Sequence, residues 1–200
     1  LLVLVVVAAC MGRVVSTGHE GTNAAADSFQ LRIHYLLLQG YKRVHQGALP
    51  LRGGHKFVME PWTSMVMDHT VENLDLYFSP GARDSDPHYL AARDRLLAGK
   101  EPWPDLASVS THDTHYVGRA AAYLSSAEAD EHQAIMATDN EGVWIFPTGR
   151  VNVLFAGGVV RTYCYEDLQR LFGLGPMQLA KPLQTWGPGS LLPECQKLAN

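Results

Sequence analysis

Two short stretches of the chain concentrate the side chains that could carry chemistry. Residues 60–73 read E-P-W-T-S-M-V-M-D-H-T-V-E-N, and residues 109–119 read V-S-T-H-D-T-H-Y-V-G-R. Both are rich in carboxylates, hydroxyls, amides and imidazoles. Polar groups at the ends of strands often form a site, because the sheet holds them rigidly while the loops expose them. We therefore expect a pocket built from these two stretches.

The carboxylates of this predicted pocket are Glu60, at the end of a predicted strand, and Glu72, at the start of a predicted helix. A carboxylate in either place can hold a ribose hydroxyl or an amine, or act as a general base. Glu72 has an equally good alternative role, which is to complement the dipole of its helix. Asn73 either contacts a ligand or bonds a backbone group and pins the turn.

His115 is the best candidate for proton transfer, because an imidazole changes charge near neutral pH. It lies four positions after Thr111, behind a predicted strand, and Arg119 follows about one helical turn later. A guanidinium there could bind a phosphate or carboxylate through two N–H groups. We predict that His115 is partly buried and within about one ligand's width of Glu60 or Glu72. The alternatives are a solvated histidine and an exposed arginine salt bridge.

A metal site is a weaker interpretation of the same stretch. His112, Asp113 and His115 place three possible ligands within four residues. A compact loop rarely directs all three side chains at one ion, so we disfavour a metal. Nucleophilic Ser-His-Asp chemistry is weaker still, because the chain has no G-x-S-x-G elbow.

The elements that must position these residues alternate between strand and helix over residues 10–125. We predict strands at 13–18, 55–59 and 106–109. We predict helices at 24–39, 71–78, 89–97 and 118–124. Gly40 would end the first helix, and Asp68 or Thr70 would cap the start of the second. This alternation predicts an α/β fold with a Rossmann-like, mostly parallel sheet and flanking helices. Val14, Val58 and Val109 would then lie on neighbouring parallel strands.

The remainder of the chain has a different pattern. Short apolar runs at 135–137, 143–146 and 151–155 are separated by turn residues, which predicts a β-rich C-terminal extension over residues 130–200 with a last helix at 165–172. Near the other end, Gly18 and Glu20 lie in a turn before the first predicted helix. Free N–H groups at such a helix start favour an anion.

Five short pieces of the chain also follow one another in a recognisable order: V-V-S-T-G-H-E-G, a helix up to Gly40, E-P-W-T, T-V-E-N and T-H-D-T-H-Y-V-G-R-A. Over residues 13–124 this order resembles the YdcF, SanA and ElyC group of bacterial α/β proteins, although four residues are added between Thr63 and Thr70. The resemblance implies a small nucleotide-like ligand or S-adenosylmethionine, and in some members a link to the cell envelope. The site it implies comprises Gly18, Glu20, Glu60, Thr70, Glu72, Asn73, Thr111, His115 and Arg119.

Composition narrows the classes of partner. The 200 residues are 46% hydrophobic and 18% charged, which suits a single globular domain. The net charge of -4 and the lack of a basic cluster longer than Lys42-Arg43 exclude a phosphate-backbone partner. Residues 1–9 are too short to span a bilayer alone. We favour a buried strand there over a signal remnant, and a cytoplasmic location slightly over a secreted one.

Three functions stay open on this evidence. The leading hypothesis is a protein that binds a small metabolite such as S-adenosylmethionine or a nucleotide. The second is a secreted or envelope hydrolase, metal-assisted through His112, Asp113 and His115. The third is a non-catalytic binding module that uses its C-terminal extension.

Overall fold

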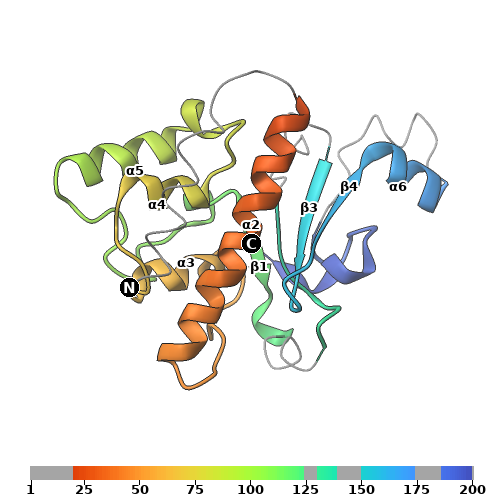
Figure 1. Ribbon diagram of the computed structural model, residues 1–200, viewed down its shortest axis with the longest axis horizontal. Coiled ribbons are helices and arrows are strands. Elements are labelled where there is room, and N and C mark those ends of the chain that lie inside the picture. The colour runs from red at the N-terminus through yellow and green to blue at the C-terminus, as the bar shows by residue number, and fades with distance from the viewer. Residues whose placement is uncertain (1–19, 124–129, 139–149, 174–185, 200) are drawn as a thin grey trace.

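The described part of the chain is built on an antiparallel β-sheet (Figure 1). A computed structural model describes residues 20–123, 130–138, 150–173 and 186–199. Within them the strands are β1 (Tyr116–Arg119), β2 (Ala134–Thr138), β3 (Arg150–Phe155), β4 (Val160–Cys164) and β5 (Leu198–Ala199). They lie in the order β4-β3-β2-β1-β5, and every neighbouring pair is antiparallel. The prediction of a mostly parallel, Rossmann-like sheet is therefore wrong.

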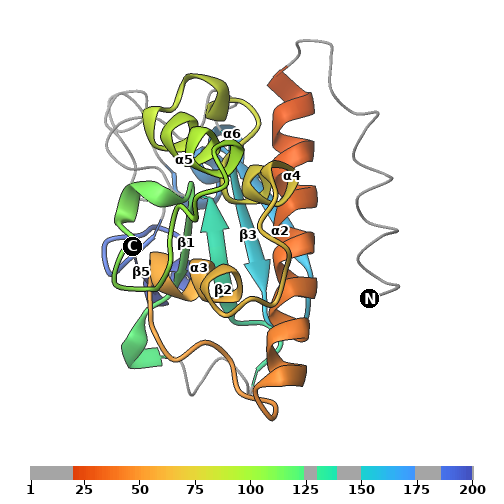
Figure 2. The ribbon, with the colours of Figure 1, turned by 90° about the vertical axis from the view of Figure 1, so that its left-hand side faces the viewer.

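In the described residues, five α-helices accompany this sheet. They are α2 (Glu20–Val44), α3 (His55–Thr63), α4 (Val71–Leu74), α5 (Pro87–Leu97) and α6 (Tyr165–Phe172). Helix α2 runs alongside β3 and β4, while α3 packs against β1 (Figure 2). Among the described residues, no helix has both the length and the apolar character needed to cross a membrane.

Helix α2 forms because apolar side chains recur along one of its faces. Leu31, Leu37 and Leu38 are buried in the core, whereas Phe29 and Leu36 point to solvent with 47% and 54% of their surface exposed. The helix continues through Gly40 to Val44, so the predicted stop at Gly40 is wrong. A buried helix face outweighs the cost of one interior glycine, which is about 1 kcal/mol.

The two strands predicted to lead into the pocket, at 55–59 and 106–109, do not form. Residues 55–59 belong to α3, where Phe57, Val58 and Met59 are all buried. A short apolar run of this kind suits a buried helix as well as a buried strand. Residues 106–109 contain a turn instead, in which the Ser108 N–H bonds the Asp105 carboxylate at 2.9 Å. Val58 and Val109 are therefore on no strand, and Val14 lies outside the described residues.

The predicted helix at 118–124 is wrong as well, because Gly118 and Arg119 belong to β1 and only a short 3-10 turn follows. Other local predictions are confirmed. Strands β2 and β3 cover 135–137 and 151–155, and α5 and α6 cover 89–97 and 165–172. The predicted strand at 143–146 lies outside the described residues.

Side chains from the two faces of the sheet enter two separate cores. Tyr116 of β1 points into the core under α2 and α3, and its neighbour Val117 points into the other. This alternation follows from the two-residue period of a strand. The second core is closed by the C-terminal segment, which contributes Leu192, Cys195 and Leu198. Both faces of the sheet are thus covered.

Two glycine substitutions test this arrangement. Gly40→Ala should raise the free energy of unfolding by up to about 1 kcal/mol, because alanine is the better helix former and its Cβ meets only Val66 at 3.4 Å. Gly118→Ala should lower it by about 3 kcal/mol, because its Cβ would lie 2.5 Å from the Gly54 carbonyl oxygen and 2.8 Å from Phe57. Urea unfolding of both variants checks this. Destabilisation by Gly40→Ala would mean that the helix does stop there.

Candidate functional site

The residues predicted to form the pocket are held by different partners. Glu60 lies in the last turn of α3, where its Oε1 accepts a hydrogen bond from the Tyr41 hydroxyl at 2.8 Å. Burial and the nearby Glu60 carboxylate both raise the pKa of Tyr41. Through this bond Glu60 ties α3 to α2.

The T-V-E-N segment forms a capped helix start. Thr70 is the N-cap of α4, and its hydroxyl accepts from the Asn73 backbone N–H at 3.3 Å. The Asn73 side chain donates to the Asp68 carbonyl at 2.7 Å, which pins the turn. Glu72 is exposed in the first turn, where a carboxylate complements the helix dipole. The structural alternatives for Glu72 and Asn73 thus fit the observed geometry.

Arg119 is fully buried and serves the sheet. Its guanidinium donates to the carbonyls of Tyr123 at 3.0 Å and Ala134 at 2.8 Å, and to the Gln133 side chain. Burial lowers the pKa of Arg119. The side chain joins β1 to the segment entering β2, so it is neither a ligand clamp beside His115 nor an exposed salt bridge.

His115 is partly buried, as predicted, with 17% of its side chain exposed. Its Nδ1 accepts from the Ser79 backbone N–H at 3.0 Å, and its Nε2 lies 2.9 Å from Asp86 Oδ2. One partner donates and the other accepts, so the neutral Nε2–H tautomer satisfies both. This geometry makes His115 a bridge between two loops through Ser79 and Asp86.

Asp86 completes this bridge. Its Oδ1 caps α5 by accepting from the backbone N–H groups of His88 at 2.7 Å and Tyr89 at 3.0 Å. Partial burial alone would raise the pKa of Asp86, but the bonds from His115, Tyr89 and His88 lower it overall. The pair therefore fixes the start of α5 against β1.

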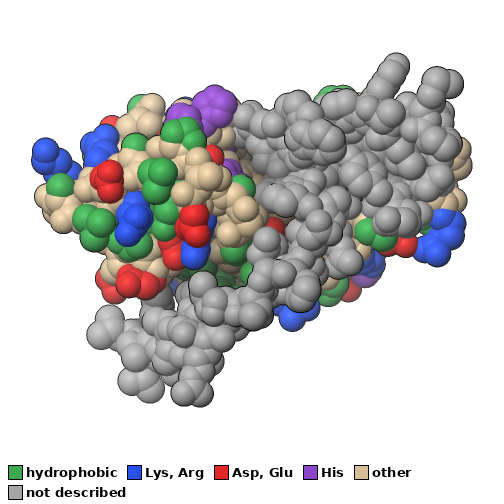
Figure 3. Space-filling model, turned by 90° about the horizontal axis from the view of Figure 1, so that it is seen from above, with side chains coloured by type: hydrophobic (Ala, Val, Ile, Leu, Met, Phe, Trp, Pro, Cys, Tyr) green, Lys and Arg blue, Asp and Glu red, His purple; other side chains and the backbone are tan. Residues whose placement is uncertain are grey.

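The three candidate metal ligands do not converge. The Asp113 side chain accepts from the backbone N–H and the hydroxyl of Ser110 at 2.6 and 2.8 Å. These bonds form a capping box for the short 3-10 turn Thr111–Asp113, in which Thr111 is half-buried. His112 stacks on His88 with ring centroids 5.0 Å apart. Seen from above, several histidine side chains lie together at one edge of the molecule (Figure 3). In the described ranges, no group of three or more His, Cys, Asp or Glu could hold a metal ion. Gly18 lies outside those ranges, and Glu20 begins α2.

A buried polar cluster that we did not predict lies between α2, the 75–79 loop and β1. The two carboxyl oxygens of Asp27 lie 3.0 Å from the hydroxyl oxygens of Ser79 and Tyr116. The Tyr116 oxygen also lies 2.6 Å from Gln30 Oε1, although its hydroxyl has only one hydrogen. A protonated Asp27 resolves this, because it donates to Tyr116 while Tyr116 donates to Gln30. Burial raises the pKa of Asp27 to about 6, against the opposing bonds from Tyr116 and Ser79.

His34 extends this cluster one further turn along α2. Its Nε2 bonds the Leu76 carbonyl at 2.9 Å, and its ring meets Tyr77 and Tyr116 edge to face. Burial lowers the pKa of His34 to about 4. The spacing of Asp27, Gln30 and His34 is the signal in the sequence, since it places a polar stripe on one face of the helix.

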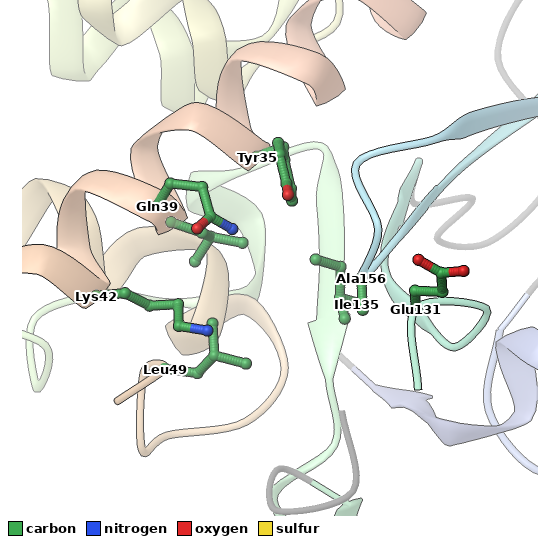
Figure 4. A pocket seen from close by; sticks show the side chains of 8 residues that line it. Tyr35, Gln39, Lys42, Leu49, Glu131, Ile135 and Ala156 are labelled. Atoms are coloured by element: carbon green, nitrogen blue, oxygen red, sulfur yellow. The ribbon is translucent and has the colours of Figure 1, made fainter. Parts of the chain in front are cut away.

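A small cavity opens at the other end of α2, between this helix, the β3–β4 turn and the segment before β2 (Figure 4). It holds about 110 Å³ and is lined by Tyr35, Leu38, Gln39, Lys42, Leu49, Glu131, Ile135 and Ala156. We call this cavity the α2 crevice. None of its residues belongs to the site that the sequence predicted.

Two tight turns build one wall of the α2 crevice. Gly158 has a φ of +83°, and a Cβ there would lie 2.8 Å from the Tyr35 ring, so only glycine lets the ring pack on this turn. Backbone bonds of 2.9 Å from Ala156 to Gln133 and 3.0 Å from Gly157 to Glu131 join the two turns. The crevice wall is therefore held in place by the backbone.

Comparisons of the chain with protein-family models, with curated proteins and with solved structures find no match.

The buried cluster makes stability depend on pH in two opposing ways. Asp27, with its pKa raised from 3.8 to about 6, contributes stability that is full below pH 3.8 and lost as pH rises through 6. His34, with its pKa lowered from 6.5 to about 4, contributes stability that is full above pH 6.5 and lost as pH falls towards 4. When the pH falls from 7 to 4.5, the free energy of unfolding of Asp27→Asn should therefore drop by about 2 kcal/mol relative to that of the wild type.

Urea unfolding at both pH values measures this difference. Asp94→Asn, which changes an exposed carboxylate on α5, is the matched control and should follow the wild type. Equal losses for Asp27→Asn and the wild type would show that Asp27 is already ionised at pH 4.5.

Asp86→Asn tests the bridge to His115. An asparagine can still cap α5 through its side-chain oxygen. Its NH2 group then faces the Nε2–H of His115, so two donors meet. If His115 changes to its Nδ1–H tautomer, its new N–H faces the donor N–H of Ser79. One bond is lost in either case, so the free energy of unfolding should fall by about 1–3 kcal/mol. The exposed neighbour Asp84→Asn is the control. A silent Asp86→Asn, or nitrogen NMR shifts showing His115 protonated at Nδ1, would contradict the bridge.

Proposed function

We propose that this protein binds a small polar metabolite in the α2 crevice. The observation that carries the proposal is the arrangement of the lining. Four polar side chains, Tyr35, Gln39, Lys42 and Glu131, surround a floor that includes the buried Leu38 and Ile135. An apolar concavity with a few polar groups at its edge is the usual form of a small-molecule site.

The size of the α2 crevice limits the ligand. Its volume of about 110 Å³ lies below the roughly 300–1,000 Å³ of pockets that enclose drug-sized molecules. It is closer to an engineered cavity of about 150 Å³ that holds benzene. We propose that the ligand has few non-hydrogen atoms. S-adenosylmethionine or a nucleotide would insert only a part of itself, and both belong in a binding panel.

Binding is better supported than His115-based hydrolysis. A general base must reach the proton that it removes, and the two ring nitrogens of His115 already face Ser79 and Asp86. The buried guanidinium of Arg119 is likewise directed at the sheet. Of the three functions open from the sequence, we therefore favour a protein that binds a small ligand.

A pocket-filling variant tests the proposal. In a panel of small acids, amines, amino acids, S-adenosylmethionine and adenine nucleotides, at least one compound should shift the amide NMR signals of Tyr35, Ile135 and Ala156. Ala156→Leu should abolish those shifts, because the larger side chain fills the α2 crevice. Ala98→Leu adds the same atoms at an exposed position after α5 and should leave binding intact.

Two outcomes would contradict the proposal. One is a panel in which no compound moves these signals at millimolar concentration. The other is a compound that binds Ala156→Leu as tightly as it binds the wild type.

A further inference from the structure

We propose that one proton on Asp27 decides whether Gln30 of α2 holds the backbone of the 75–79 loop. The switch is a chain of hydrogen-bonding groups that runs from Asp27 through Tyr116 and Gln30 to the Asp75 carbonyl. None of these residues lines the α2 crevice, so the switch does not depend on ligand binding there.

With the proton on Asp27, each link of the chain joins one donor to one acceptor. The Asp27 carboxyl donates from Oδ1 to the Tyr116 oxygen at 3.0 Å, and the Tyr116 hydroxyl donates to Gln30 Oε1 at 2.6 Å. The Gln30 NH2 group then donates to the Asp75 carbonyl at 2.7 Å. Each group has one role towards each neighbour, so the direction of the whole chain follows from the proton at its start.

Loss of that proton reverses the first link. An ionised Asp27 only accepts, so the one hydrogen of Tyr116 turns towards the carboxylate, and bonds to a charged acceptor are the stronger ones. The Gln30 Oε1 atom then faces the Tyr116 oxygen with no hydrogen between them. The amide restores this link only by turning its NH2 group to Tyr116, which takes the donor away from the Asp75 carbonyl.

Burial decides which end of the chain loses its bond. Tyr116 has none of its surface exposed and Gln30 has 6%, so two facing oxygens without a hydrogen would be costly there. Asp75 is half-buried, and its carbonyl also accepts from the Phe78 N–H at 3.4 Å. The loss therefore falls on the Asp75 carbonyl, and α2 lets go of the start of the loop.

The switch works in the pH range in which Asp27 titrates. Burial raises the pKa of Asp27 to about 6, so the chain is tied to the loop in acid and released as pH rises through 6. His34, which meets the Tyr116 ring edge to face from the same helix, has its pKa lowered by burial to about 4. It therefore stays neutral while Asp27 changes charge.

The other charged and titratable groups around the cluster lie towards the loop. The Ser79 N–H donates to His115 Nδ1, and Ser79 also bonds Asp27. Asp75, whose pKa is raised by burial, pairs with Arg83 at 2.8 Å. A signal that follows His115 or Asp75 would persist in a variant whose residue 27 no longer titrates, which separates these groups from the switch.

An NMR titration from pH 5 to 8 tests the switch. In the wild type, the Gln30 side-chain amide and the Leu76 backbone amide should shift together with a midpoint near pH 6. Leu76 reports on the loop because its N–H shares a peptide group with the Asp75 carbonyl. Above the midpoint, NOEs from the Gln30 NH2 hydrogens to the Tyr116 ring should grow.

Asp27→Asn fixes the chain in its acid state. An asparagine turns its NH2 group towards Tyr116 and its oxygen towards Ser79, so it imitates the protonated carboxyl at every pH. The Gln30 and Leu76 signals of this variant should stay near their wild-type positions at pH 5. The matched control Asp94→Asn, an exposed carboxylate on α5, should titrate as the wild type does.

Tyr116→Phe removes the hydroxyl in the middle of the chain. The Asp27 carboxyl carbon should still titrate in this variant, while Gln30 and Leu76 no longer follow it. Two results would refute the switch. One is a wild type whose Gln30 and Leu76 signals do not move between pH 5 and 8, and the other is an equal titration of these signals in Asp27→Asn.

Discussion

The packing of α2 across the antiparallel sheet is the constraint on which the rest of the structure depends. A sheet with both faces covered needs an apolar layer on each side, and α2 contributes Leu31, Leu37 and Leu38 to one of these layers. The helix is longer than the part of the sheet that it covers. Its first half therefore packs on the 75–79 loop, and its last turns overhang the β3–β4 turn, where the α2 crevice forms.

The polar cluster at the first half of α2 shows how this packing becomes specific. A buried carboxyl and a buried imidazole each cost stability unless they find partners. Asp27 and His34 find them in Ser79, Tyr116 and the Leu76 carbonyl, so only one setting of the helix satisfies them. The same setting places Tyr35 and Gln39, on the next turns, beside the strands. The cluster thus positions the crevice without lying in it.

The sequence predicted individual elements better than their arrangement. The apolar runs of β2 and β3, and the cap at Thr70, are local signals, and the structure confirms them. Strand direction depends on contacts between distant segments, which a local pattern does not contain. The run at 55–59 was ambiguous for a physical reason, since a segment buried on all sides has no polar face to set its period.

A related limit applies to the residues of the predicted site. His115 and Arg119 are chemically capable residues, but both satisfy groups inside the fold, and their hydrogen-bond partners come from distant positions. The α2 crevice was harder to foresee, because its lining comes from α2, Leu49, Glu131 and the β3–β4 turn. No short motif joins these segments. What the sequence did contain was the stripe of Tyr35, Gln39 and Lys42 along one helix face.

Transfer of magnetisation between a bound ligand and the crevice tests the central claim most directly. With a carbon-13-labelled compound that shifts the crevice signals, intermolecular NOEs should join the ligand to the Ile135 methyl groups and the Tyr35 ring. Such contacts would place the ligand between α2 and the sheet. NOEs to side chains outside the α2 crevice, with none to Ile135 or Tyr35, would contradict the account.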